Sequence, residues 1–248
     1  MNTKKTKPVV RFDLLGLWPG ADVEITKELI NIVFDIVEEL FGKKLRSPVL
    51  ITNYPNTKNP LACYDMKDGC YQVHLCVKSG LSWCQIVYQL AHELCHLHSN
   101  YADSKGHKHK WFEESLCEMC SIVVLIELSE QWNKTSMHRY NYAASIKEYA
   151  ESLNSMTGYV PKSQDAFISW LAINIEELER NSENRELNGV VARYLFNNRF
   201  STQSTGWACV GMLNQWNCHE NLSFTEYKDS WRRCCADSAE VNEIVNLL

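Results

Sequence analysis

The H-E-x-x-H motif from His92 to His96 constrains the fold of this chain more than any other feature, because it lies within an uninterrupted helical pattern. Between Ser82, a suitable N-cap, and His98 the sequence has no Gly or Pro and repeats apolar residues at helical spacing. Positions i and i+4 share one face of a helix, so both imidazoles can reach the same metal ion. The sequence therefore predicts a helix that carries two metal ligands.

The two histidines lie on the polar side of this predicted helix. At about 100° per residue, His96 falls about 40° from His92, and the apolar residues cluster roughly opposite; these are Trp83, Val87, Leu90 and Leu94. Glu93 is turned by about 100° from His92, beside the ligand face. This arrangement suits the floor of a cleft, and the alternative is an ordinary solvated face. His98 falls on the core flank, where we expect it to be structural or exposed.

A catalytic zinc needs a third protein ligand, and the best candidates lie on a second predicted helix, Trp111 to Trp132. The adjacent acids Glu113 and Glu114 compete for this role. Glu114 is favoured because it shares its helix face with Glu118, one turn further on. In such a pair one carboxylate can bind metal while the other orients a ligand histidine through its free ring N–H. The alternative is a solvent-exposed acidic stripe.

The HELCH motif followed by W-x-x-E, from Trp111 to Glu114, resembles the gluzincin metallopeptidases, in which a second helix supplies a Glu ligand. In aminopeptidases of this clan the pattern is commonly W-x-x-E-G, and here Ser115 stands in place of the Gly. The resemblance extends over about Ser82 to Leu128, less than a fifth of the chain. It leaves the subfamily open.

The resemblance implies that His92, His96 and Glu114 bind one Zn²⁺ per chain and that Glu93 is the general base. Zinc lowers the pKa of its bound water to about 7, and a neighbouring carboxylate takes the proton during attack on a peptide carbonyl. The expected substrate is a peptide or protein. Glu118 is expected to support a ligand histidine from outside the ligand set.

The expected fold class is α+β and zincin-like, with a small mixed sheet over the active-site helix. An amphipathic helix is predicted from Val23 to Lys43, and β-branched runs predict strands at Val49–Asn53 and Tyr71–Val77. Asp68-Gly69 predicts a turn before the second of these strands. By the resemblance, Tyr71–Val77 is the edge strand that pairs with substrate, and an ordinary internal strand is the alternative.

We expect two parts, a metal-binding half at 1–132 and a mainly helical lobe at 133–248 that forms the far wall of the cleft. Asn100–Lys110 is polar and is predicted to be the loop between the two ligand helices. Gly158–Pro161 is the clearest break in the lobe. Helices are predicted at Asn141–Leu153, Asp165–Arg180, Glu186–Phe196, near Gly206–Cys218, at Phe224–Cys235 and at Ala239–Leu248.

Charge and hydropathy exclude several classes of partner. A formal net charge of −5 and a pI of about 5.9 argue against nucleic acid. No stretch approaches the length of about 18 apolar residues that a membrane span needs, and we expect no membrane partner. The start lacks an apolar segment typical of a signal peptide, so a cytoplasmic location is expected, with non-classical export left open. The eleven cysteines are then expected to be reduced, including the helical pair Cys117 and Cys120.

Three functions fit these patterns. The first is a zinc-dependent metallopeptidase with Glu93 as general base. The second is a catalytically silent gluzincin-like domain that binds zinc in a regulatory or protein-interaction role, and the third is a helical interaction protein in which the motif is accidental. The group that stabilises the transition state stays open among six residues: Tyr101, His107, His109, His138, Tyr140 and Tyr142. A second ion at His107 and His109 is a weaker possibility.

Overall fold

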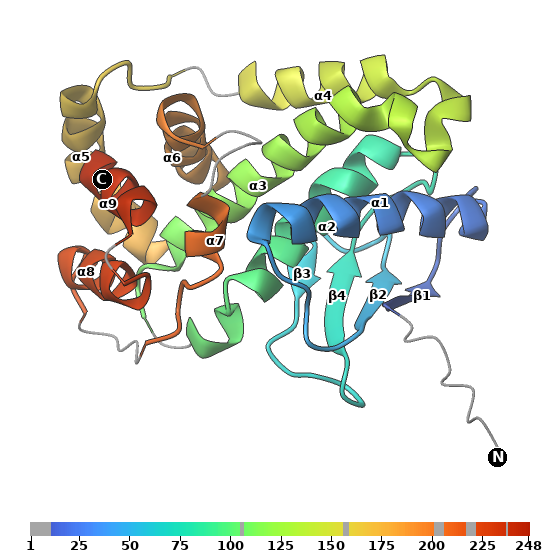
Figure 1. Cartoon of the computed structure of the whole chain (residues 1–248), viewed down its shortest axis with the longest axis horizontal. Coiled ribbons are helices and arrows are strands. Elements are labelled where there is room, and N and C mark those ends of the chain that lie inside the picture. Colours follow the sequence, from blue (N-terminus) through green and yellow to red (C-terminus); the bar gives the residue numbers. More distant parts are fainter. Residues whose placement is uncertain (1–10, 105–106, 156–158, 201–205, 217–221, 237) are drawn as a thin grey trace.

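The computed structural model describes residues 11–104, 107–155, 159–200, 206–216, 222–236 and 238–248. These residues form a mixed α/β structure in which helices predominate and a four-stranded sheet lies at one end (Figure 1). The strands are β1 (Phe12–Gly16), β2 (Val49–Asn53), β3 (Leu61–Ala62) and β4 (Tyr71–Leu75), in the spatial order β1-β2-β4-β3. The β1, β2 and β4 strands are parallel, and β3 runs antiparallel to β4. A small mixed sheet is therefore present, as expected.

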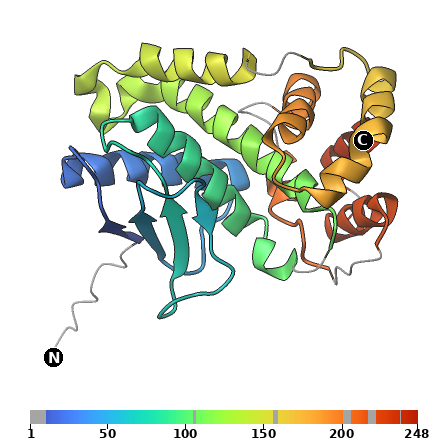
Figure 2. The same cartoon turned by 180° about the vertical axis from the view of Figure 1, so that it is seen from behind.

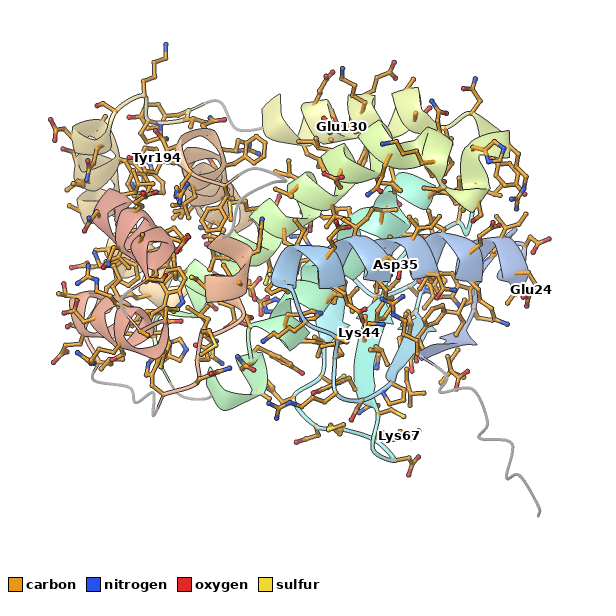
Figure 3. The ribbon with its side chains drawn as sticks, in the orientation of Figure 1. Glu24, Asp35, Lys44, Lys67, Glu130 and Tyr194 are labelled. Atoms are coloured by element: carbon orange, nitrogen blue, oxygen red, sulfur yellow. The ribbon has the colours of Figure 1, made fainter. Side chains whose placement is uncertain are left out.

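The position of β4 corrects the expectation that Tyr71–Val77 is an edge strand. It lies between β2 and β3, so both of its edges are paired, and β3 is the edge strand on that side. The two-residue β3 strand was not predicted, because a run this short carries no usable periodicity. The predicted turn before β4 is confirmed, because Asp68 and Gly69 have φ of 51° and 76°. In Figure 3 the neighbouring Lys67 is labelled at the end of the loop that leads into β4.

The helix α1 (Val23–Phe41) ends two residues before the predicted end at Lys43 and buries one face, which includes Leu29, Val33 and Ile36. Its first turn is capped by Asp22, whose carboxylate accepts from the backbone N–H groups of Glu24 and Ile25 at 2.9 and 3.1 Å. The Phe12 ring of β1 stacks on the Phe34 ring of α1 with centroids 5.4 Å apart. This contact joins the outermost parallel strand to the core.

The helices α2 (Trp83–His98) and α3 (Lys110–Gln131) pack against each other at the centre of the molecule. The α2 helix also contacts α1, β3 and β4, which places the motif helix directly beside the sheet. Ser82 occupies the N-cap position of α2, but its side chain makes no capping hydrogen bond. His98 is buried and stacks on Phe41 with centroids 4.6 Å apart, so it is a structural residue.

A short 3-10 helix, η1 (Tyr101–Ser104), follows α2, and two more, η2 (Trp132–Lys134) and η3 (Ser136–Tyr140), lead out of α3. The predicted helices of the C-terminal part are confirmed, although the segment near Gly206–Cys218 is helical only as far as Val210. Cys218 and part of the predicted break at Gly158–Pro161 lie outside the described residues. The helices are α4 (Ala143–Ser155), α5 (Gln164–Arg180), α6 (Arg185–Asn198), α7 (Gly206–Val210), α8 (Phe224–Cys234) and α9 (Ala239–Leu247).

The two predicted parts share one continuous core. Figure 2 shows α3 crossing the molecule between the sheet-bearing half and the helical part, and both α4 and α6 pack on it. The α7 helix contacts α1, and the Trp207 ring lies 5.7 Å from the Phe41 ring. Both rings are buried within the main hydrophobic cluster. Among the described helices, none is both long and apolar enough to cross a membrane.

Candidate metal centre

The imidazoles of His92 and His96 meet the carboxylate of Glu114 between α2 and α3. His92 Nε2 lies 3.2 Å from Glu114 Oε2, and His96 Nε2 lies 3.4 Å from Glu114 Oε1. The two imidazole rings are 5.0 Å apart. One turn of α2 thus presents two ring nitrogens to one carboxylate from α3, the three groups that the sequence proposed as ligands.

The second nitrogen of His96 is held by Glu113. His96 Nδ1 lies 2.8 Å from Glu113 Oε1, and the hydroxyl of Ser99 donates to the same oxygen at 3.2 Å. A carboxylate only accepts, so Nδ1 carries the proton of this hydrogen bond and the ring orientation is fixed. Glu113 is only 3% exposed, so its contacts are shielded from competing water.

Glu118 was expected to play this orienting role, and the structure places it elsewhere in the same pocket. Its carboxylate accepts a hydrogen bond from the hydroxyl of Tyr88, on α2. Tyr88 precedes His92 by four residues and therefore lies on the same helix face. The acid that contacts a candidate ligand histidine through its remaining ring nitrogen is Glu113.

Charges in this cluster stabilise one another. Burial by itself lowers the pKa of His96, but the carboxylates of Glu114 and Glu113 outweigh it and raise that pKa well above its usual value. Burial by itself raises the pKa of Glu114, and the imidazoles of His96 and His92 reverse this and lower it. The site therefore stabilises positive charge at the point where the ring nitrogens and Glu114 meet.

Glu93 lies next to this point and is also enclosed. Only 2% of it is exposed, and burial raises the pKa of its carboxyl group. The backbone of Ala62, in the edge strand β3, lies beside the Glu93 carboxylate and partly offsets this rise of its pKa.

These residues form one end of a pocket of about 380 Å³. The pocket is bordered by β3 and the segment before it, by α2 and α3, and by the start of α6. Five glutamates line it, Glu93, Glu113, Glu114, Glu118 and Glu183, together with the cations Lys110 and Arg185. This excess of carboxylates favours a cation within the pocket.

Cys117 offers a second way to complete a metal site. Ligand atoms of His92, His96 and Cys117 all lie within 4.8 Å of one another. Cys117 is fully buried, and burial raises the pKa of its thiol well above the usual value. The described residues that line the pocket include Glu114 but not Cys117. A metal held by Glu114 would therefore face the pocket, whereas one held by Cys117 would lie deeper between the helices.

Two imidazoles and one carboxylate are donor types that a zinc ion accepts, and three protein ligands would leave one position open. The fit rests on an observation in the structure: both Nε2 atoms approach the same carboxylate, while Nδ1 of His96 is already engaged by Glu113. Metal-binding histidines typically have this second hydrogen bond.

Of the six residues left open as transition-state stabilisers, Tyr101 lines the pocket, with its ring 5.8 Å from that of His96. His138, Tyr140 and Tyr142 lie outside the lining. His107 and His109 are buried against Tyr227, and His109 Nε2 lies 2.6 Å from the backbone oxygen of Leu222, so both are built into the packing of the helical part.

Several pocket residues were not predicted from the sequence. Tyr88 could have been found, because it lies four residues before His92 on a helix already identified. Arg185 and Asn188 could not, because they come from α6 and only the fold brings them to the pocket. Lys110 is also at the pocket, where its ammonium donates to the Tyr64 hydroxyl at 2.9 Å.

Comparison with known proteins adds no assignment: no protein-family model, no curated protein and no solved structure matches this chain. The resemblance to gluzincins therefore rests on the motif residues alone.

Proposed function

We propose that this protein is a zinc-dependent metallopeptidase of gluzincin type. The observation that carries the proposal is the approach of Glu114 to the Nε2 atoms of both His92 and His96 at the end of a pocket that also contains Glu93. The proposed ligands are the two histidines and Glu114, with one Zn²⁺ per chain. Glu93 is the proposed general base, and it is the intervening acid of the motif.

Zinc bound by these residues would supply a Lewis acid and a water of lowered pKa. Glu93 accepts the proton of the attacking water and passes it to the leaving nitrogen. Glu113 holds His96 through the contact between its carboxylate and Nδ1 of the ring. Burial of Glu93 keeps bulk water from competing for its proton.

The edge strand β3 supports a peptide backbone as the substrate. Leu61 and Ala62 line the pocket, and one edge of their strand is paired with β4. In the spatial order of the strands β3 is the last, so its opposite edge is not paired with a strand of this sheet. An extended peptide could add to such an edge through main-chain hydrogen bonds.

A second function is favoured by the His92, His96 and Cys117 cluster. Coordination by the Cys117 thiolate would place the zinc deeper between α2 and α3, away from the pocket, where it would stabilise the contact between the two helices. Such a site would have a structural role, and the protein would bind zinc without hydrolysing peptides. Glu114 is preferred because it lines the pocket, where a substrate carbonyl could reach the metal.

The proposal is tested with the parent protein and the Glu93→Gln variant. Zinc content is measured by atomic emission after dialysis, and cleavage is followed by mass spectrometry on a diverse peptide library. The peptidase predicts about one zinc in both proteins and a rate at least about 10²-fold lower in the variant, because the base is lost while the ligands remain.

Zinc in both proteins without cleavage by the parent would support the silent zinc-binding domain instead. Absence of zinc from the parent would contradict both metal-dependent functions. Equal cleavage by the parent and by Glu93→Gln would contradict the role of Glu93. The Glu118→Gln variant is the matched control, because it changes a nearby carboxylate that contacts Tyr88 and neither histidine.

A further inference from the structure

The turn after α7 joins the helical part to the metal-binding half through polar side chains. The ammonium of Lys43 donates to the Gly211 oxygen at 2.6 Å. The Asn100 amide donates to the Gly211 and Leu213 oxygens at 3.2 and 2.8 Å. Lys43 and Asn100 come from the first half of the chain, so this turn is held across the junction between the two parts.

The last residue of this turn, Asn214, reaches the metal centre. Its amide donates to Glu113 Oε2 at 2.8 Å and to the Ser99 oxygen at 3.1 Å. Both partners are acceptors, so the orientation of the amide is fixed by chemistry. Asn214 is fully buried and has a φ of 62°, a left-handed conformation that Asn tolerates better than most residues.

Tyr227, on α8, fixes the other end of the same amide. Its hydroxyl donates to Asn214 Oδ1 at 3.0 Å, and the Tyr227 side chain is fully buried. The hydrogen bonds therefore form a chain from Tyr227 through Asn214 and Glu113 to Nδ1 of His96. Each link is shielded from water, which strengthens it and makes the loss of one partner costly.

We propose that Asn214 is a positioning residue for the metal centre, acting through Glu113 on His96, and that Tyr227 holds the Asn214 amide in place. The helical part thereby contributes to zinc affinity although it supplies none of the proposed ligands. This inference rests on the proposed zinc site. By linkage, zinc binding also stabilises the docking of the 211–214 turn on the metal-binding half.

The test compares zinc affinity in the Asn214→Gly and Tyr227→Phe variants with that of the parent. Glycine tolerates the left-handed backbone of position 214 and removes the side chain with its amide. Phenylalanine keeps the ring of Tyr227, so this variant removes one hydroxyl and retains the packing. Zinc dissociation constants are measured by competition with a fluorescent chelator, under conditions in which circular dichroism shows each protein to be folded.

Loss of outer partners of metal ligands typically weakens metal binding by about 10- to 100-fold. We expect about 10-fold weaker zinc binding in Asn214→Gly and about 3-fold in Tyr227→Phe, which is one step further from His96. The matched control is Tyr194→Phe, on α6 (Figure 3). Tyr194 is equally buried and stacks on Phe167, outside this chain of hydrogen bonds, so its zinc affinity should equal that of the parent.

Parent-like zinc affinity in a folded Asn214→Gly or Tyr227→Phe protein would overturn the inference, as would an equal loss in Tyr194→Phe. If Asn214→Gly does not fold, Tyr227→Phe decides. A parent that binds zinc without cleaving peptides removes the proposed activity but leaves this inference intact. A parent that binds no zinc overturns both.

Discussion

The two ring nitrogens of His96 have different partners. Nδ1 faces Glu113, which is buried and further held by Ser99, whereas Nε2 faces Glu114 at the pocket. Adjacent residues on α3 therefore reach opposite sides of one imidazole. This division separates a carboxylate that can bind metal from one that can only orient its neighbour.

Substitution of the two acids next to the histidines should weaken zinc binding to different extents. Glu114→Ala removes a proposed ligand and should weaken zinc binding by more than about 100-fold, beyond the range expected for an outer partner. Glu113→Gln keeps the shape of the side chain and should weaken zinc binding by about 10- to 100-fold. Chelator competition measures both.

The Cys117→Ala variant decides whether Glu114 or Cys117 is the third ligand. If Glu114 is the third ligand, Cys117→Ala keeps the zinc affinity of the parent to within a few-fold. A large loss in Cys117→Ala together with a small loss in Glu114→Ala would assign the third position to the thiolate and contradict the open site.

The candidate site was predictable from sequence where its residues lie on one helix or on adjacent helices with clear periodicity. Spacing alone brought together His92, Glu93 and His96, and the helical wheel separated Glu114 from Glu113. The wheel favoured Glu118 for the orienting role, whereas the carboxylate that contacts His96 Nδ1 belongs to Glu113, because a wheel shows which face a residue occupies and not which atom it reaches. Asn214 lies 101 residues from Glu113, and no local pattern connects them.

At the scale of elements, α2 and the edge strand β3 come together at the proposed general base, Glu93. The β3 strand is only two residues long, yet both of its residues line the pocket and it pairs with β4. The amphipathic helices and the β2 strand were predictable, since each has a buried stripe or an alternating pattern of sufficient length. Strand order was not, because it depends on pairing between distant segments.

The end of β1 depends on a glycine. Gly16 has a φ of 80°, and a Cβ at this position would overlap the backbone oxygen of Asn53 in the neighbouring strand. Gly16→Ala should lower the free energy of unfolding by about 2 to 3 kcal/mol, from the left-handed backbone and the clash together. Urea denaturation at neutral pH measures the change.

Gly42→Ala is the matched control for this substitution. Gly42 also has a positive φ, 62°, but an added Cβ there meets open space. Its cost should be about 1 kcal/mol, from the backbone alone. Equal losses in the two variants would show that the Asn53 oxygen imposes no constraint on β1.

At the scale of the whole molecule, buried aromatic and polar groups join the helical part to the sheet-bearing half. His107 is one of them: it packs against Tyr227 and its Nδ1 accepts from the His109 backbone N–H at 3.0 Å. Burial, with the nearby His109 and Lys110, lowers the pKa of His107 to about 4. It is therefore neutral in the folded protein near neutral pH.

The free energy of unfolding should fall in acid at pH values where His107 is still neutral in the folded protein. An unfolded chain binds a proton at His107 below a pH of about 6.5, whereas the folded protein does so only near 4. Stability should therefore fall as pH decreases through this window, with a slope of at most about 1.4 kcal/mol per pH unit from this group. Urea titrations between pH 7 and 4.5 measure it.

The His107→Gln variant isolates the contribution of His107, because glutamine cannot titrate. Its stability should decline less steeply than that of the parent over the same pH range. An identical slope in both proteins would mean that His107 does not take part in the acid response.

The proposed zinc site is tested most directly by locating zinc by anomalous diffraction above and below its absorption edge in crystals of the zinc-loaded protein. The proposed ligands predict one peak per chain, about 2.0 to 2.2 Å from His92 Nε2, His96 Nε2 and a Glu114 oxygen, with its remaining position open to the pocket. A peak bonded to the Cys117 sulfur at about 2.3 Å, or no peak between α2 and α3, would contradict it.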